Sequence, residues 1–260
     1  FAARMWMRDT KGGLVAAMYG PSSATLPINE GRQQLTVTEE TGYPFSETIA
    51  FTFKTPTPVT MPFTFRIPGW CEAPAVTING QPYKGTLTPG TFVSLERTFC
   101  DGDAVVLRLP MPVKQLTWEN QGVTVERGPL LFAYPVPEKV LNDDKVYENM
   151  RGKKSSDPVR FPALDIRPDG EWNYALASKS AADFTLVNTG SKGYPLDPGA
   201  SPVVIKVPAR KVNGWTLLEN RYTPPLPDKD KVECDATVET LTLVPYGSTR
   251  LRIGVFPVAR

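Results

Sequence analysis

The amino-acid sequence predicts an all-β protein made of two consecutive antiparallel β-sandwiches of the jelly-roll or immunoglobulin-like kind. Its 260 residues include 27 prolines and 20 glycines, and their even spacing leaves no room for a long amphipathic helix. Residues 63–67 alternate apolar and polar side chains and stop at Pro68-Gly69, the pattern of a half-buried strand closed by a turn. Short runs of this kind recur along the whole chain and are typical of sandwiches.

In the first half of the chain, strand signals alternate with turn signals. Asn79-Gly80 and Asp101-Gly102 are dipeptides that favour tight hairpins. The pattern therefore predicts a hairpin at Asn79-Gly80 and a tight turn at Asp101-Gly102. The expected strands are 14–19, 35–38, 48–54, 63–67, 76–78, 91–95 and 104–109.

The pattern of strands restarts after residues 114–118, so we place a domain boundary there and expect domains at 1–116 and 117–260. Residues 138–160 are polar and charged with few apolar anchors, and this composition predicts a mobile excursion from the second sandwich. The expected strands of the second domain are 123–126, 130–134, 184–187, 203–207, 238–244 and 251–256.

Composition excludes several classes of partner and chemistry. The 29 basic and 27 acidic residues are interspersed, so we expect no nucleic-acid partner, and no apolar run has the length of a membrane span. The chain has no histidine, which removes the Ser-His-Asp, Cys-His and His-metal chemistries. The cysteines at 71, 100 and 234 are isolated in sequence and predict small buried apolar side chains. We therefore expect no cofactor and no metal in this chain.

The acidic residues that stand close together do not form a catalytic pair. Glu39 and Glu40 are adjacent, and because adjacent residues of a strand point to opposite faces, they cannot both line one pocket without a bulge. Asp101 and Asp103 flank a turn glycine, where aspartate usually caps its own backbone. No glycine-rich run has the spacing of a nucleotide site. The sequence therefore predicts no catalytic residue.

Aromatic residues are the remaining candidates for a binding role. Trp172, Tyr174 and Trp215 could offer flat faces on which sugar rings stack, and the alternative is that they are core aromatics. Trp70 follows the turn that ends the expected strand at 63–67, and Trp118 stands at the expected domain boundary. We interpret these two as residues of inter-domain packing.

Several motifs together resemble the C-terminal half of bacterial β-L-arabinofuranosidases of glycoside hydrolase family 127. In order and spacing the set spans nearly the whole chain. The motifs are Thr41-Gly42-Tyr43-Pro44-Phe45, Phe65-Arg66-Ile67-Pro68-Gly69-Trp70-Cys71, Val76-Thr77-Ile78-Asn79-Gly80, Asp101-Gly102-Asp103 with Leu109-Pro110-Met111-Pro112-Val113, Glu126-Arg127-Gly128-Pro129-Leu130-Leu131, and Pro245-Tyr246-Gly247-Ser248-Thr249-Arg250-Leu251-Arg252.

The resemblance implies an enzyme in which an N-terminal helical barrel carries catalysis, with a zinc-bound cysteine nucleophile, and β-sandwich domains follow. This chain resembles the sandwiches alone. Its three cysteines do not match the catalytic cluster, so no catalytic or zinc residue is carried over. Since Phe1 is not an initiator methionine, we expect a piece of a longer protein.

The leading hypothesis is a non-catalytic accessory region of an arabinofuranosidase-like glycoside hydrolase. It would brace the upstream catalytic barrel of the same polypeptide or mediate assembly, including homo-oligomers, and would not be an enzyme alone. One alternative is an independent carbohydrate-binding module for a plant-type glycan, and another is a surface interaction protein with immunoglobulin-like sandwiches. The resemblance favours a periplasmic or extracellular location.

Overall fold

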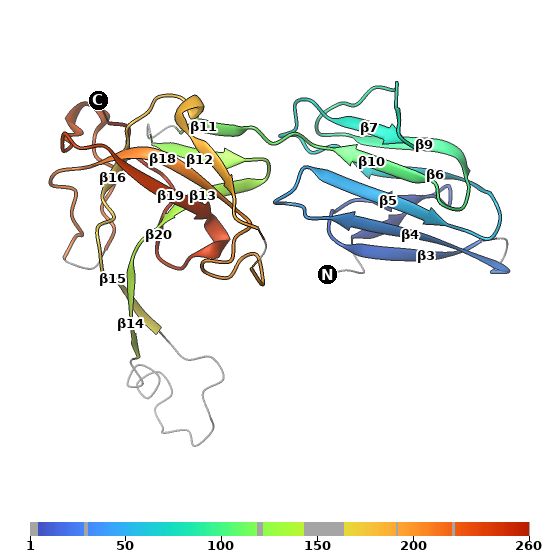
Figure 1. Ribbon diagram of the computed structural model, residues 1–260, viewed down its shortest axis with the longest axis horizontal. Helices are drawn as coiled ribbons and strands as arrows, with labels where there is room; N and C mark the ends of the chain where they lie inside the picture. Colours follow the sequence, from blue (N-terminus) through green and yellow to red (C-terminus); the bar gives the residue numbers. More distant parts are fainter. Residues whose placement is uncertain are drawn as a thin grey trace, which may run out of the picture. The chain divides into compact units, whose positions relative to one another are not determined.

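The computed structural model describes residues 5–28, 31–118, 122–142, 164–190, 192–219 and 222–259. The chain divides into two compact units, Phe1–Pro112 and Val113–Arg260 (Figure 1). Within the described ranges, strands dominate and the helical residues are confined to short 3-10 helices. None of these helices is long and apolar enough to cross a membrane. The predicted all-β class is confirmed.

The first unit consists of two β-sheets that face each other in two layers (Figure 1). One sheet has the order β1-β2-β6-β9, and the other has the order β3-β4-β5-β10-β7-β8. Its strands are β1 (Trp6–Arg8), β2 (Leu14–Ala16), β3 (Ser22–Ile28), β4 (Gln33–Thr41), β5 (Thr48–Lys54), β6 (Val59–Arg66), β7 (Ala75–Ile78), β8 (Gln81–Pro82), β9 (Phe92–Phe99) and β10 (Ala104–Arg108).

One pairing in the first unit differs from the antiparallel expectation. β2 pairs with β6 in parallel, with Leu14 opposite Phe63. Between these two strands the chain crosses to the other sheet and builds β3, β4 and β5 there. A parallel pair needs a long crossover of this kind, because a tight turn can only reverse the direction of the chain.

Phenylalanine rings from both sheets fill the first core. Phe51 and Phe53 project from β5, and Phe63 projects from β6 between them, with ring centroids 5.1 Å from each. The ring of Phe53 also stacks on Phe99 of β9 at 4.0 Å. All four side chains are fully buried. Because aromatic side chains bury large apolar areas and prefer such edge and offset contacts, this cluster dominates the packing of the first unit.

A strand that the sequence patterns do not indicate is β3, which lies at the edge of the six-stranded sheet. Its sequence contains two serines, a threonine and Pro27, and only Leu26 among its residues is buried. Proline is tolerated in an edge strand because its missing N–H need not join a ladder. The strand therefore depends on pairing with β4 over seven residues rather than on its own composition.

The second unit contains one eight-stranded sheet and a separate two-stranded ribbon, β14-β15. The main order is β11-β12-β13-β19-β18-β16, while β17 pairs with β18 and β20 pairs with β13. The elements are β11 (Val113–Thr117), β12 (Val123–Arg127), β13 (Leu130–Pro135), β14 (Glu138–Asn142), β15 (Leu164–Pro168), β16 (Tyr174–Leu176), η2 (Ala181–Asp183), β17 (Thr185–Asn188), β18 (Val203–Lys211), η3 (Lys229–Lys231), β19 (Glu239–Pro245), η4 (Tyr246–Ser248) and β20 (Arg252–Ile253).

Residues 256–259 join two distant strands of this sheet, and we call them the closing segment. Phe256 bridges Val123 of β12, and Val258 bridges Leu176 of β16. Because β12 and β16 are far apart in the strand order, one segment can pair with both only if the sheet curls back on itself. Phe256 is fully buried as a result.

Two boundaries predicted for the second half can be set beside these strands. The units divide at Pro112, ahead of β11, whereas the sequence places the boundary at 116, inside that strand. Of the predicted excursion at 138–160, the first five residues form β14 and pair with β15. Residues 143–160 lie outside the described residues.

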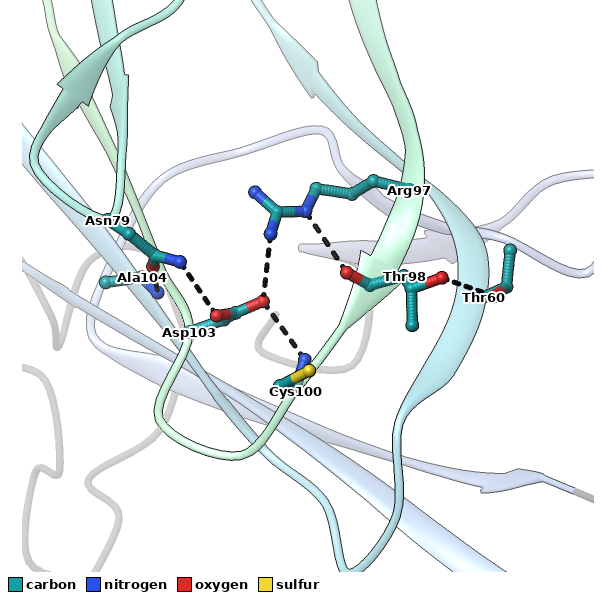
Figure 2. A network of polar contacts seen from close by, with 7 residues as sticks. All are labelled: Thr60, Asn79, Arg97, Thr98, Cys100, Asp103 and Ala104. Carbon is teal, nitrogen blue, oxygen red and sulfur yellow. Dashed lines mark hydrogen bonds and ion pairs between the residues drawn. The ribbon is translucent and has the colours of Figure 1, made fainter.

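Asp103 lies at the centre of a polar network that joins two turns of the first unit (Figure 2). Its carboxylate accepts hydrogen bonds from the Cys100 N–H at 3.0 Å, Asn79 Nδ2 at 2.8 Å and the Arg97 guanidinium at 3.2 Å. Asn79 Oδ1 in turn accepts from the Ala104 N–H at 2.8 Å. Desolvation opposes ionisation of Asp103, but these donors outweigh it and lower its pKa. The turn-capping interpretation of Asp103 is confirmed.

Replacing Asp103 with asparagine should lower the free energy of unfolding of the first unit by about 2 kcal/mol at pH 7, because charge-assisted hydrogen bonds are lost. The lowered pKa means that the carboxylate stabilises the fold above the unfolded-state pKa and ceases to do so as pH falls through the folded-state value. The deficit of Asp103→Asn should therefore shrink towards pH 2. Urea unfolding measures it, with Glu96→Gln, a change at an exposed ion pair, as the control that should stay near wild type.

Candidate functional site

The aromatic residues predicted to form a sugar-stacking platform do not form one. Tyr174 and Trp215 are only 5% and 6% exposed, and Trp172 is half-buried. Trp172 meets Trp215 edge-on, with ring centroids 4.9 Å apart. A ring must offer an open face to stack on a sugar, so Tyr174 and Trp215 are corrected to core residues.

Trp215 has a structural role that explains its burial. Its ring lies in a small core with Ala175, Val212 and Val232, and its Nε1 donates a hydrogen bond of 3.0 Å to the Pro225 carbonyl. Buried indole N–H groups usually find such a partner. The tryptophan thus fixes the proline-rich loop at residues 223–228 to the second unit.

Tyr174 connects two glutamates at the surface of the second unit. Its hydroxyl lies 3.2 Å from Glu239 Oε2 and 3.4 Å from Glu171 Oε2, and burial, followed by the Glu239 charge, raises the pKa of Tyr174. Glu171 also forms an ion pair with Lys211. Both glutamates are exposed and already paired, so they resemble a surface network rather than the enclosed acid and base of a glycosidase.

The two residues predicted to pack between domains differ in exposure. Trp70 is half-buried and packs against the core of the first unit. Trp118 is 57% exposed, and its Nε1 donates to Thr124 Oγ1 at 3.1 Å. Leu116, two residues earlier and within β11, is 41% exposed. Inter-domain packing by Trp70 and Trp118 stays a prediction.

Arg66 organises a polar cluster at one end of the first unit. Its Nε donates to the Ala17 carbonyl at 3.0 Å, and its guanidinium lies 5.9 Å from the centre of the Tyr19 ring. The Tyr19 hydroxyl donates to the Arg66 carbonyl. Tyr43 contributes a second ring, which meets the Tyr19 ring edge-on with centroids 5.6 Å apart. These contacts tie the end of β6 to the segments before β3 and after β4.

Glu39 is the buried acid of this region; the sequence predicted only that it and Glu40 point to opposite faces, and not which of them is buried. It is 1% exposed; Oε1 accepts from the Gly20 N–H at 2.9 Å, while the buried Oε2 accepts nothing from the described residues. Desolvation raises the pKa of Glu39 to about 7, against the opposing effect of the Gly20 hydrogen bond. The signal was present, because Glu39 continues the inward face of Leu35 and Val37 in β4. Glu40 points outward, as strand alternation predicted.

Metal-ligand residues do not gather in the part of the chain that the structure describes, where no group of three or more His, Cys, Asp or Glu could hold an ion. The three cysteines are not paired with one another. Cys71 is buried, Cys234 is partly exposed and Cys100 is exposed. The expectation of buried thiols is therefore wrong for Cys100. This residue lies in the turn after β9, where its N–H donates a hydrogen bond to Asp103.

Comparison with known protein families gives a match for the first unit. The family model described as β-L-arabinofuranosidase, GH127 middle domain, matches residues 13–111, which is nearly all of that unit. The first unit is therefore similar to a GH127 middle domain. The family resemblance seen in the sequence motifs is thereby confirmed. No curated protein matches the chain in sequence.

Solved structures extend the likeness from the middle domain to the whole chain. A GH127 β-L-arabinofuranosidase from Geobacillus stearothermophilus T6 has a TM-score of 0.59 at 21% identity, covering 95% of this chain and 33% of its own. A glycoside hydrolase has a TM-score of 0.64 at 22% identity, with 98% and 37% covered. A GH127 β-arabinofuranosidase has a TM-score of 0.60 at 16% identity, with 95% and 35% covered. At these identities the shared property is the fold, and the chain spans about a third of each protein.

Proposed function

We propose that this chain is a non-catalytic accessory region of an arabinofuranosidase-like glycoside hydrolase, where it braces the catalytic barrel or mediates assembly. The observation that carries the proposal is the match of residues 13–111 to the GH127 middle domain. The solved structures support it, because the chain corresponds to about a third of each of those proteins. The absence of histidine from the sequence is in keeping with a chemistry located elsewhere.

Exposed apolar side chains at the end of β11 supply a surface for such bracing. Leu116 belongs to β11 and Trp118 is the first residue after it, and both are more than a third exposed. Apolar side chains grouped in this way are typical of contact surfaces. We propose that they pack against the catalytic barrel of the same polypeptide.

Activity of the isolated chain tests the first part of the proposal. The purified 260-residue chain should hydrolyse an aryl arabinofuranoside no faster than buffer does, because the residues that the structure describes do not bring together the enclosed acid and base of a glycosidase. The coding sequence upstream of Phe1 should encode a helical barrel with a cysteine and glutamate cluster. An enzyme-like rate from the isolated chain, or an upstream region without a barrel, would overturn the assignment.

Replacing Trp118 with alanine tests the bracing surface. In the isolated chain, stability should change by no more than about 1 kcal/mol, because the ring is mostly exposed and donates one hydrogen bond. In the full-length protein the same change should lower the melting temperature of the barrel. Tyr194→Ala is the control, because Tyr194 is 65% exposed elsewhere in the second unit. Equal melting of both full-length variants and the wild type would contradict the proposal.

A further inference from the structure

The second unit contains a cavity of about 520 Å³ that has no part in the role proposed above. Its lining comes from β11 and β12, from the loop between β16 and η2, from residues 226–229, and from the closing segment. This volume falls in the range of sites that hold small molecules. All of the lining residues belong to the second unit.

Pro257 and Val258 form one apolar wall, and backbone hydrogen bonds hold this wall in place. The Pro257 carbonyl accepts from the Leu176 N–H at 2.9 Å, and the Leu176 carbonyl accepts from the Ala259 N–H at 2.8 Å. Phe256, just before the wall, exchanges two hydrogen bonds with Val123. The wall is therefore part of the sheet rather than a free tail.

Leu226 and Pro227 contribute another apolar part of the lining, which is also anchored. Trp215 donates to the carbonyl of Pro225, one residue before them, and Leu226 packs against the core around Trp215. A site whose walls are fixed before binding loses less conformational entropy when a ligand enters. Trp215, which the sequence predicted to contact sugar, thus holds this part of the cavity lining in place.

Two lysines bring positive charge to the cavity. Lys179 and Lys229 are exposed, and neither forms an ion pair with a described residue. Nearby carboxylates are engaged by other donors: Asp183 accepts from the Ser178 hydroxyl at 2.5 Å, and Asp228 pairs with Lys231 at 3.1 Å. The two ammonium groups are therefore available to a negatively charged ligand.

Gln115 and Thr117 add neutral hydrogen-bonding groups from β11. They are two residues apart in the strand, so they share the face that lines the cavity. Gln115 Oε1 is buried and accepts no hydrogen bond from the described residues. An amide and a hydroxyl next to apolar walls match a ligand that carries several hydroxyl groups on a compact ring.

We propose that this cavity binds a uronic-acid unit, a sugar ring that bears a carboxylate. Lys179 and Lys229 would bind the carboxylate, Gln115 and Thr117 the ring hydroxyls, and the anchored prolines the apolar C–H face of the ring. A bare phosphate would leave the apolar walls unused, and a neutral sugar would leave both lysines unpaired. The site is distinct from the bracing surface and does not depend on the proposed role.

Calorimetric titration of the full 260-residue chain with digalacturonate at low salt tests this assignment. Binding should be saturable, and the methyl ester of the same disaccharide, which lacks the charges, should bind at least tenfold more weakly. The double variant Lys179→Gln/Lys229→Gln should lose at least tenfold in affinity. Lys206→Gln, an exposed lysine of β18 outside the cavity, should bind as the wild type does.

A second variant separates binding in the cavity from general attraction to a basic surface. Thr117→Trp leaves the net charge unchanged and fills the cavity from the edge strand β11, so it should abolish binding while thermal unfolding shows an intact fold. Absence of saturable binding, equal affinity for acetate or phosphate, or full affinity in the double variant or in Thr117→Trp would each overturn the proposal.

Discussion

Replacing Glu39 with glutamine should raise the free energy of unfolding of the first unit by roughly 3 kcal/mol at pH 8. The buried Glu39 has a pKa of about 7, above its ordinary value of 4.5, because burial disfavours the ionised form. At pH 8 the carboxylate is ionised in both the folded and unfolded states, and the folded state must then hold a desolvated charge. Glutamine has the shape of the protonated acid and removes that cost.

The sign of the pH dependence follows from the raised pKa. Below about pH 4.5 the group is protonated in both states, and wild type and Glu39→Gln should be nearly equal in stability. Between pH 4.5 and 7 only the unfolded state releases the proton, so wild-type stability should fall as pH rises, and above pH 7 the difference should level off.

Urea unfolding of the first unit at several pH values from 4 to 8 measures this difference. Glu40→Gln is the matched control, because Glu40 is the next residue of β4 and its side chain is exposed. It should show the wild-type pH dependence. If Glu39→Gln were no more stable than wild type at pH 8, the pKa of Glu39 in the folded state would not be raised.

Replacing Phe63 with alanine should destabilise the first unit by about 3 to 5 kcal/mol, the usual cost of a phenylalanine-sized cavity in a core. The ring is fully buried and contacts four others, those of Phe51, Phe53, Phe65 and Phe99. These neighbours belong to strands of both sheets, so collapse into the space would require both layers to move. The cost should therefore lie in the upper part of this range.

The midpoint of urea unfolding gives the stability of Phe63→Ala, provided that the slope stays constant. Phe92→Ala is the control on the neighbouring strand, since Phe92 is 55% exposed, and it should cost no more than about 0.5 kcal/mol. A similar loss in both variants would mean that the exposed ring of Phe92 contributes as much to stability as the buried ring of Phe63, contrary to the core described above.

Features fixed by neighbouring residues were predictable from the sequence. The span 48–54 was predicted with the bounds that β5 has, because its alternation is unbroken. The hairpin at Asn79-Gly80 was predicted because this dipeptide accepts positive φ, and the two residues have φ of 50° and 76°. Local backbone preference is sufficient in both cases.

The exposure of individual side chains and the meeting of distant residues at one cavity were not predictable, because both depend on residues far apart in the chain. Nothing near Trp215 in sequence shows that its ring faces Val232 and holds a later loop. Lys179 and Lys229 meet Gln115 at one cavity only after the sheet curls. In contrast, the inward direction of Glu39 could have been predicted, because Leu35, Val37 and Glu39 stand at every second position of β4 and therefore share one face.

The closing segment has a consequence for folding during synthesis. Its residues pair with Val123 and Leu176, so the curled sheet cannot close until Ala259 has left the ribosome. The first unit pairs only residues that precede position 113 and can fold while the second is still being made. Contacts that span so much of the chain are also slow to form. Until the closing segment emerges, the nascent second unit will therefore keep open the sheet that receives Phe256, which is when a chaperone would be most useful.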